Sequence, residues 1–176
     1  MLACETFGAL YMMDFLHWLE QTGFSTWVRE SPSVWAFPTV LLIHTIGMGL
    51  VVGVNAGIDL RILGLAPKLP LAPMEKYFPI LWTGFWMNAV TGVILVVQDA
   101  TTKLANPDFY VKMVFIALAV INVQMLRKRV FRDPLVDQQP PSTNVKILAV
   151  TSLIFWLGAI TAGRLMAYVG PVSGLK

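Results

Sequence analysis

The chain has 176 residues, of which 56% are hydrophobic and 13% are charged, and its mean hydropathy is +0.67. A soluble domain usually carries about 25% charged residues, so this composition excludes a soluble globule, and its many apolar residues exclude a disordered chain. The length suits one domain. We therefore predict an all-α integral membrane protein whose residues 1–176 form a single transmembrane domain.

The first predicted element is an amphipathic helix over residues 5–20. Its apolar residues gather on one side, and these are Phe7, Leu10, Tyr11, Phe15 and Trp18. Polar residues recur at helical spacing on another side, and these are Asp14, His17 and Gln21. A helix of this kind lies in the membrane interface rather than across the bilayer. We expect His17 to be solvated there, with a weak metal site or a docking patch formed with Asp14 and Glu20 as the alternatives.

Four membrane spans follow, because the chain contains four apolar segments of the roughly 20 residues that a spanning helix needs. No charged residue occurs from Val34 to Ile58. The third segment starts at Asn106-Pro107, where Asn106 can cap a helix and Pro107 fits its first turn. The predicted spans are about 34–60, 77–98, 107–126 and 145–169. Together they predict an integral membrane four-helix bundle.

The basic residues indicate the orientation of this bundle. The chain carries 13 Lys and Arg, for a net charge of +3, and most of the basic residues lie in two interhelical segments. These are Arg61, Lys68, Lys76, Arg127, Lys128, Arg129, Arg132 and Lys146. Cytoplasmic loops are enriched in Lys and Arg, so we predict a multi-pass protein of a bacterial inner membrane with both termini in the periplasm. The basic excess then reflects topology, and nucleic acid is excluded as a partner.

The first span has two different faces. His44 lies about ten residues into the span, and Met48, Asn55 and Asp59 follow on the same side of the helix. An ionisable group at that depth is a candidate functional residue. The opposite side carries Gly49, Gly53 and Gly57 in a GxxxGxxxG pattern. This pattern favours close packing against another helix.

Other spans place polar residues at a similar depth, counted from the outer end. Asn88 and Asp99 belong to the second span, Lys112 to the third and Arg164 to the fourth. We expect these side chains to converge near His44 in the outer half of the bundle. Asp99 would then pair with Arg164 or Lys112, since a lone charge at such depth is unfavourable.

Three interpretations of this cluster stay open. In the first, His44 forms a hydrogen bond to a neighbouring helix and Asp99 neutralises a cation. In the second, His44 and Met48 bind copper, since imidazole and thioether suit Cu(I), or His44 binds haem b with Arg164 at a propionate. In the third, the cluster lines a pocket for a small molecule, a lipid or a quinone.

Enzyme signatures do not occur in the sequence, which has no Walker loop, GxGxxG, HExxH, GxSxG or CxxC motif. The chain therefore favours a non-catalytic role. We expect a small subunit of a larger membrane or periplasmic assembly, or a homo-oligomer, embedded in membrane lipid. The alternative is a redox or copper-handling membrane protein that binds haem b or copper at His44.

Several strings over about residues 15–170 resemble those of a known family. They are Arg29-Glu30-Ser31 with Phe37-Pro38, Asp59-Leu60-Arg61-Ile62-Leu63-Gly64, Asn106-Pro107-Asp108-Phe109, Trp156-Leu157-Gly158 and Ala162-Gly163-Arg164. The sequence resembles an uncharacterised bacterial family of small four-helix inner-membrane proteins, which is loosely similar to the membrane domain of copper resistance protein D. The resemblance implies a four-helix bundle and no established activity. The recurrent residues that it implies are His44, Asp59, Arg61, Lys112 and Arg164.

Overall fold

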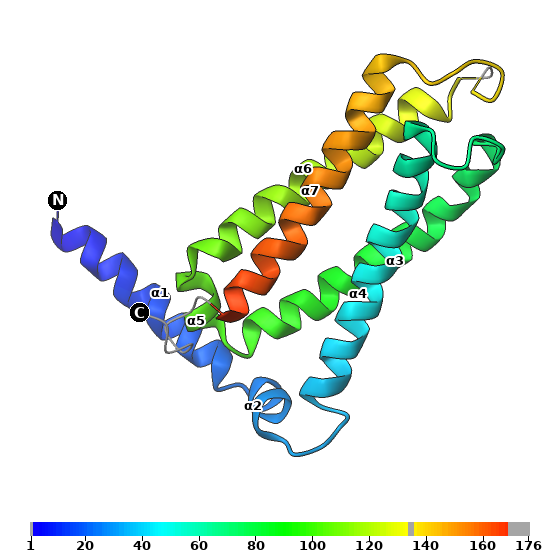
Figure 1. Ribbon diagram of the computed structural model, residues 1–176. Coiled ribbons are helices and arrows are strands. Elements are labelled where there is room, and N and C mark those ends of the chain that lie inside the picture. Colours follow the sequence, from blue (N-terminus) through cyan, green and yellow to red (C-terminus); the bar gives the residue numbers. More distant parts are fainter. Residues whose placement is uncertain (1, 134–135, 169–176) are drawn as a thin grey trace.

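The computed structural model describes residues 2–133 and 136–168, and it confirms an all-α fold. Among these residues, four helices are long and apolar enough to cross a membrane. They pack as a bundle that short N-terminal helices precede (Figure 1). In chain order the helices are α1 (Leu2–Glu20), α2 (Gly23–Glu30), α3 (Phe37–Leu63), the 3-10 helix η1 (Ala72–Tyr77), α4 (Phe78–Val97), α5 (Ala100–Ala105), α6 (Pro107–Val130) and α7 (Thr143–Tyr168).

The ends of the spans follow local chemistry. Pro38 occupies the first turn of α3, and Gly64 ends that helix with a φ of +105°, a conformation that favours glycine. Asn106 accepts a hydrogen bond from the Asp108 amide at the start of α6, as predicted. The α6 helix continues to Val130 rather than ending at residue 126, because its basic last turn suits the negative end of the helix dipole. The predicted end of the fourth span, Val169, lies outside the described residues.

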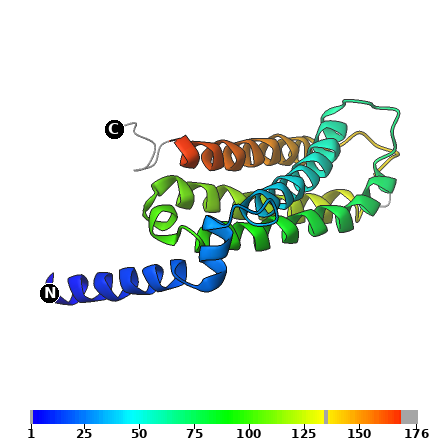
Figure 2. The same cartoon turned by 90° about the horizontal axis from the view of Figure 1, so that it is seen from below.

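The bundle consists of two helical hairpins. The α3 helix packs along α4, α6 packs along α7, and contacts between α3 and α7 join the pairs (Figures 1 and 2). Two segments, 64–77 and 131–142, connect the hairpins' helices at the same end of the molecule. We call this the loop end.

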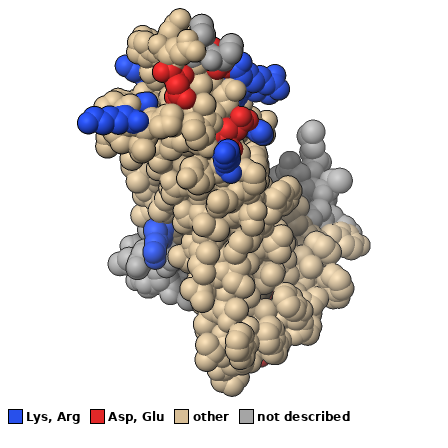
Figure 3. Space-filling view, turned by 90° about the vertical axis from the view of Figure 1, so that its right-hand side faces the viewer, with Lys and Arg blue, Asp and Glu red and all other residues tan. Residues whose placement is uncertain are grey.

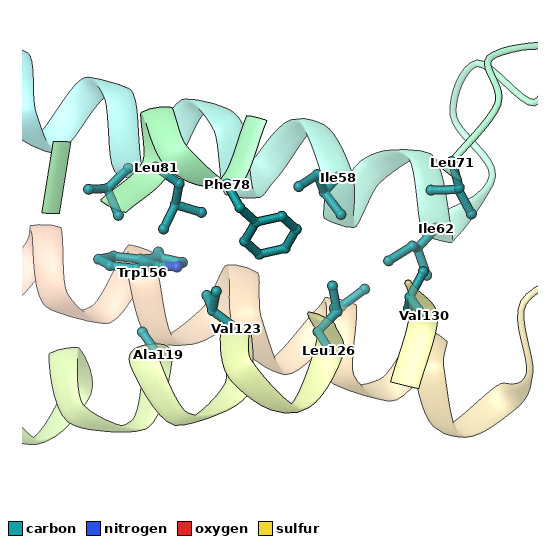
Figure 4. Packing of buried hydrophobic residues seen from close by; sticks show 12 residues of the cluster. Ile58, Ile62, Leu71, Phe78, Leu81, Ala119, Val123, Leu126, Val130 and Trp156 are labelled. Carbon is teal, nitrogen blue, oxygen red and sulfur yellow. The ribbon is translucent and has the colours of Figure 1, made fainter. Parts of the chain in front are cut away.

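The main hydrophobic core lies toward the loop end (Figure 4). Its buried side chains come from both hairpins and include Ile58, Phe78, Leu81, Val123, Leu126 and Trp156. Phe78 of α4 meets Phe131 edge to face, with ring centroids 5.4 Å apart. The two connecting segments are also joined, since the Asp137 carboxylate accepts hydrogen bonds from the Leu71 amide at 2.5 Å and the Ala72 amide at 3.1 Å. The core and these hydrogen bonds therefore hold the two hairpins together at the loop end.

Charged side chains gather at this same loop end. Figure 3 shows blue and red atoms concentrated there and a mostly tan surface along the helices. Arg61 contributes by donating hydrogen bonds to the carbonyl oxygens of Leu69 and Pro67. The basic residues that the sequence concentrates in two interhelical segments therefore lie together at one end of the molecule.

The N-terminal helices extend the fold beyond the predicted interfacial segment. The α1 helix runs past residues 5–20 at its N-terminal end, and its axis points away from the bundle (Figure 2). Aromatic side chains such as Phe15 and Trp18 are exposed on it. Glu20 attaches α1 to α5, since its carboxylate accepts hydrogen bonds from the Thr101 amide at 2.7 Å and hydroxyl at 2.6 Å. Burial raises the pKa of Glu20, but the two Thr101 hydrogen bonds and the electrostatic influence of His17 and Arg29 together outweigh this, so the pKa lies below its ordinary value.

Candidate functional site

His44 contacts the neighbouring helix α4 through its ring. Its Nδ1 lies 3.0 Å from the Thr91 hydroxyl oxygen, and the Thr91 hydroxyl itself donates to the Met87 carbonyl at 2.6 Å. Because a hydroxyl has a single hydrogen, this geometry makes Nδ1–H the donor to Thr91. The predicted hydrogen bond to a neighbouring helix is confirmed. In the neutral ring, Nε2 then carries a free lone pair.

A close crossing of α3 and α4 positions this histidine. A Cβ on Gly47 would lie 2.8 Å from the Asn88 amide nitrogen and the Gly84 carbonyl oxygen, so the two backbones nearly touch. Asn88 donates its side-chain amide to the His44 carbonyl at 2.9 Å. Gly92 leaves room for the imidazole, since a Cβ there would lie 3.3 Å from Cε1. Glycine and asparagine therefore fix the level and orientation of His44.

Lys112 reaches the same region from α6. Its side chain is half-buried and lies over Gly163 of α7, where a Cβ would be 3.5 Å from Cε and 3.6 Å from Nζ. It interacts electrostatically with His44. All four spans therefore contribute to one region, which we call the His44 site and define as His44, Asn88, Thr91, Lys112 and Gly163.

The ion pair of Asp99 differs from the expected one. Asp99 forms its ion pair with Lys103 at 3.5 Å, rather than with Arg164 or Lys112. Arg164 is exposed on α7. The local pair arises because Asp99 and Lys103 lie one turn apart around the start of α5, a short helix that the sequence pattern does not predict.

A haem or a metal fits the His44 site only in part. Met48 is half-buried one turn below His44 on α3, so imidazole and thioether form a two-ligand donor set suited to Cu(I). His44 and Met48 lie one turn apart on the same helix, so they could not ligate one haem from its two opposite faces. His17 is an exposed residue of α1, and its Nδ1 lies 3.8 Å from the Glu20 carboxylate. Within the described part of the chain, no group of three His, Cys, Asp or Glu residues could hold a metal ion.

A second polar cluster lies between α3 and α7, deep in the bundle. The Asn55 amide donates to the Asp59 carboxylate and to the Ser152 hydroxyl oxygen, both at 2.6 Å, and Ser152 hydrogen-bonds to Asp59 in turn. Asp59 has no exposed surface. The shared face of Asn55 and Asp59 is visible in the sequence, but Ser152 is not a predicted site residue. Only the register of α3 against α7 brings it there.

The three glycines of the GxxxGxxxG pattern lie on the outside of the bundle. Gly49, Gly53 and Gly57 are exposed, and a Cβ at each would meet nothing within 4 Å. The close crossing inside the chain uses Gly47 and Gly84 instead. The packing that the pattern predicts therefore stays a prediction about contact with another molecule.

Comparison with known proteins leaves the family open. No family model, curated protein or solved structure matches the chain. The four long apolar helices agree with the small four-helix membrane protein that the resemblance implies. The chain is a membrane protein with four candidate spans, and its activity has to be inferred from its own residues.

Proposed function

We propose that the protein is a non-catalytic subunit of a larger membrane assembly, and that a neighbouring subunit packs against the outer face of α3. We define this face by Gly49, Gly53 and Gly57. The supporting observation is the contrast between two sets of glycines in the same helix. The space next to Gly47 is occupied by α4, whereas a Cβ on any of the three glycines of the outer face would meet nothing within 4 Å.

A helix face made of glycines can bind another helix in a membrane. Lipid tails are as apolar as leucine, so helices in a bilayer associate through close backbone packing rather than by avoiding water. Glycines at four-residue spacing allow another helix to approach closely. Each also has a cost, because glycine in a helix is less favourable than alanine by about 0.5–1 kcal/mol. Three glycines that do nothing for the chain's own packing therefore favour a partner helix.

We further propose that the loop end faces the cytoplasm of a bacterial cell, with both termini in the periplasm. The concentration of basic side chains at the loop end supports this orientation (Figure 3).

Gly53→Leu is expected to abolish the association, because a leucine at this point prevents close approach of another backbone. The measurement is the mass of the protein, extracted in mild detergent, by light scattering. Wild type should run as a homo-oligomer or with a partner, and Gly53→Leu as a monomer. Ala117→Leu is the matched control, since Ala117 is an exposed residue of α6. A monomeric wild type without a co-purifying protein would contradict the proposal.

A second candidate function is copper handling at His44, and the hydrogen bond to Thr91 favours it. A histidine whose Nδ1–H is held by an oxygen presents Nε2 to a metal, as ligating histidines do. If this function holds, protein purified after growth with copper carries near-stoichiometric copper, and His44→Ala removes it. An absorption spectrum of the same sample tests the haem alternative through a Soret band. A colourless, copper-free wild type would rule out both.

A further inference from the structure

A groove of about 330 Å³ opens between α4 and α6 at the loop end. It occurs on the side of the bundle that no helix closes. The hairpins meet through α3 and α7, and the described residues show no comparable packing between α4 and α6. The groove is lined by Glu75, Phe78, Trp82, Val123, Gln124, Arg127, Lys128 and Arg132. We call it the α4–α6 groove.

The part of this groove nearest the loop end is cationic. Arg127, Lys128 and Arg132 are all exposed, and Glu75 is the acidic lining residue, which leaves an excess of positive charge. Arg127 is held in place at two points. Its guanidinium lies 5.1 Å from the centroid of the Phe78 ring and 3.3 Å from the Glu75 carboxylate. A positioned guanidinium is well suited to bind a phosphate group.

The part of the groove farther from the loop end is apolar. Val123 and Trp82 line it one turn nearer the bundle centre. Below them, Trp86 on α4 and Ile121 on α6 are 64% and 56% exposed, in the part of each helix that can span a membrane. The groove and the helix surfaces beyond it are therefore cationic toward the loop end and apolar toward the middle of the spans. Their polarity changes in the same direction as that of a phospholipid.

We infer that the α4–α6 groove binds one anionic phospholipid. The lipid phosphate contacts Arg127, Lys128 and Arg132, and an acyl chain descends along Trp82 and Trp86. Basic pockets between membrane helices are known to bind anionic headgroups. The site is separate from the outer face of α3, so it does not depend on the association proposed for that face.

The test compares lipid retention in two charge-matched variants by native mass spectrometry. One variant replaces the groove cations (Arg127→Gln, Lys128→Gln and Arg132→Gln). The control replaces three cations near the same end that do not line the groove (Lys68→Gln, Lys76→Gln and Lys146→Gln). Each protein, purified in detergent, is titrated with phosphatidylglycerol, phosphatidylcholine or inorganic phosphate. Each basic residue contributes about fivefold to anionic-lipid binding, so the groove variant should bind phosphatidylglycerol on the order of 100-fold more weakly than the control.

Wild type and control should retain one phosphatidylglycerol and little phosphatidylcholine, and inorganic phosphate should not displace the lipid. Equal retention by groove variant and control would overturn the inference, as would equal binding of both lipids or displacement by phosphate, which would indicate a simple anion site. Glu75→Gln provides a second test that keeps the groove cations. It removes the acidic lining residue, while the Phe78 ring still holds Arg127. It should therefore strengthen phosphatidylglycerol retention several-fold, because the groove gains net positive charge, and an unchanged affinity would count against the site.

Discussion

Gly84→Ala is expected to be among the most damaging single-methyl additions to this protein. A Cβ at Gly84 would lie 2.7 Å from the Leu50 Cβ, 2.9 Å from the Gly47 carbonyl oxygen and 3.1 Å from the Val51 amide nitrogen. Two of these atoms belong to the backbone of α3, so α3 and α4 would have to separate. Overpacking of this kind destabilises a protein by about 1–3 kcal/mol. Reversible unfolding in mixed micelles with rising denaturing detergent measures this loss.

Gly57→Ala is the control for Gly84→Ala. It adds the same methyl group to α3 at a point where nothing else in the chain lies within 4 Å, so the stability of the isolated monomer should stay unchanged or rise slightly. His44 provides a second readout, because its hydrogen bond to Thr91 spans the same crossing. If Gly84→Ala leaves both the unfolding midpoint and the His44 ring resonances of the wild type unchanged, the close crossing does not position His44.

Asn55→Leu is the second large effect that we expect. The Asn55 amide donates to both Asp59 and Ser152, and these two residues are 0% and 1% exposed. The leucine would remove both donated hydrogen bonds and leave a buried carboxylate short of donors. An unsatisfied buried polar group costs about 1–3 kcal/mol, and a charged one costs more. The same micelle titration should therefore show a loss at the upper end of this range.

A triple variant separates this mechanism from simple misfit. Replacing all partners of a buried polar group by apolar residues can be nearly neutral. Asn55→Leu with Asp59→Leu and Ser152→Ala should therefore recover most of the stability that Asn55→Leu alone loses. If the triple variant is as unstable as the single one, loss of the hydrogen bonds is not the cause.

The sequence alone predicts the four spans, because charged residues interrupt an otherwise apolar chain at the right intervals. The inward side of α3 is also predictable, since His44, Asn55 and Asp59 share one face of a helix. The short helices α2, η1 and α5 are not predicted, because each is eight residues or fewer, which is about two helical turns. Thr22 is the one local signal for α2, since its hydroxyl oxygen caps that helix by accepting from the Ser25 amide.

The partners of the site residues cannot be predicted without knowing how the helices pack against one another. Thr91 is one of several polar residues in its span, and nothing in the sequence selects it as the partner of His44. Gly47 and Gly84 are single glycines in different helices, so no motif marks them. The GxxxGxxxG motif is conspicuous, yet its glycines face outward. In each case the register of one helix against the next decides which residues meet, and a single sequence does not determine that register.

Cross-linking inside the native membrane shows directly whether another subunit packs against the outer face of α3. A photoreactive amino acid in place of Ile46, an exposed residue seven positions before Gly53 on the same side of α3, samples the outer face without filling a glycine position. The same amino acid at position 117 samples the exposed side of α6. After illumination, mass spectrometry identifies what each position has captured. We predict one defined protein adduct from position 46, lost when Gly49→Leu and Gly57→Leu are added, and only lipid adducts from position 117. Lipid adducts alone from both positions would contradict a partner on this face.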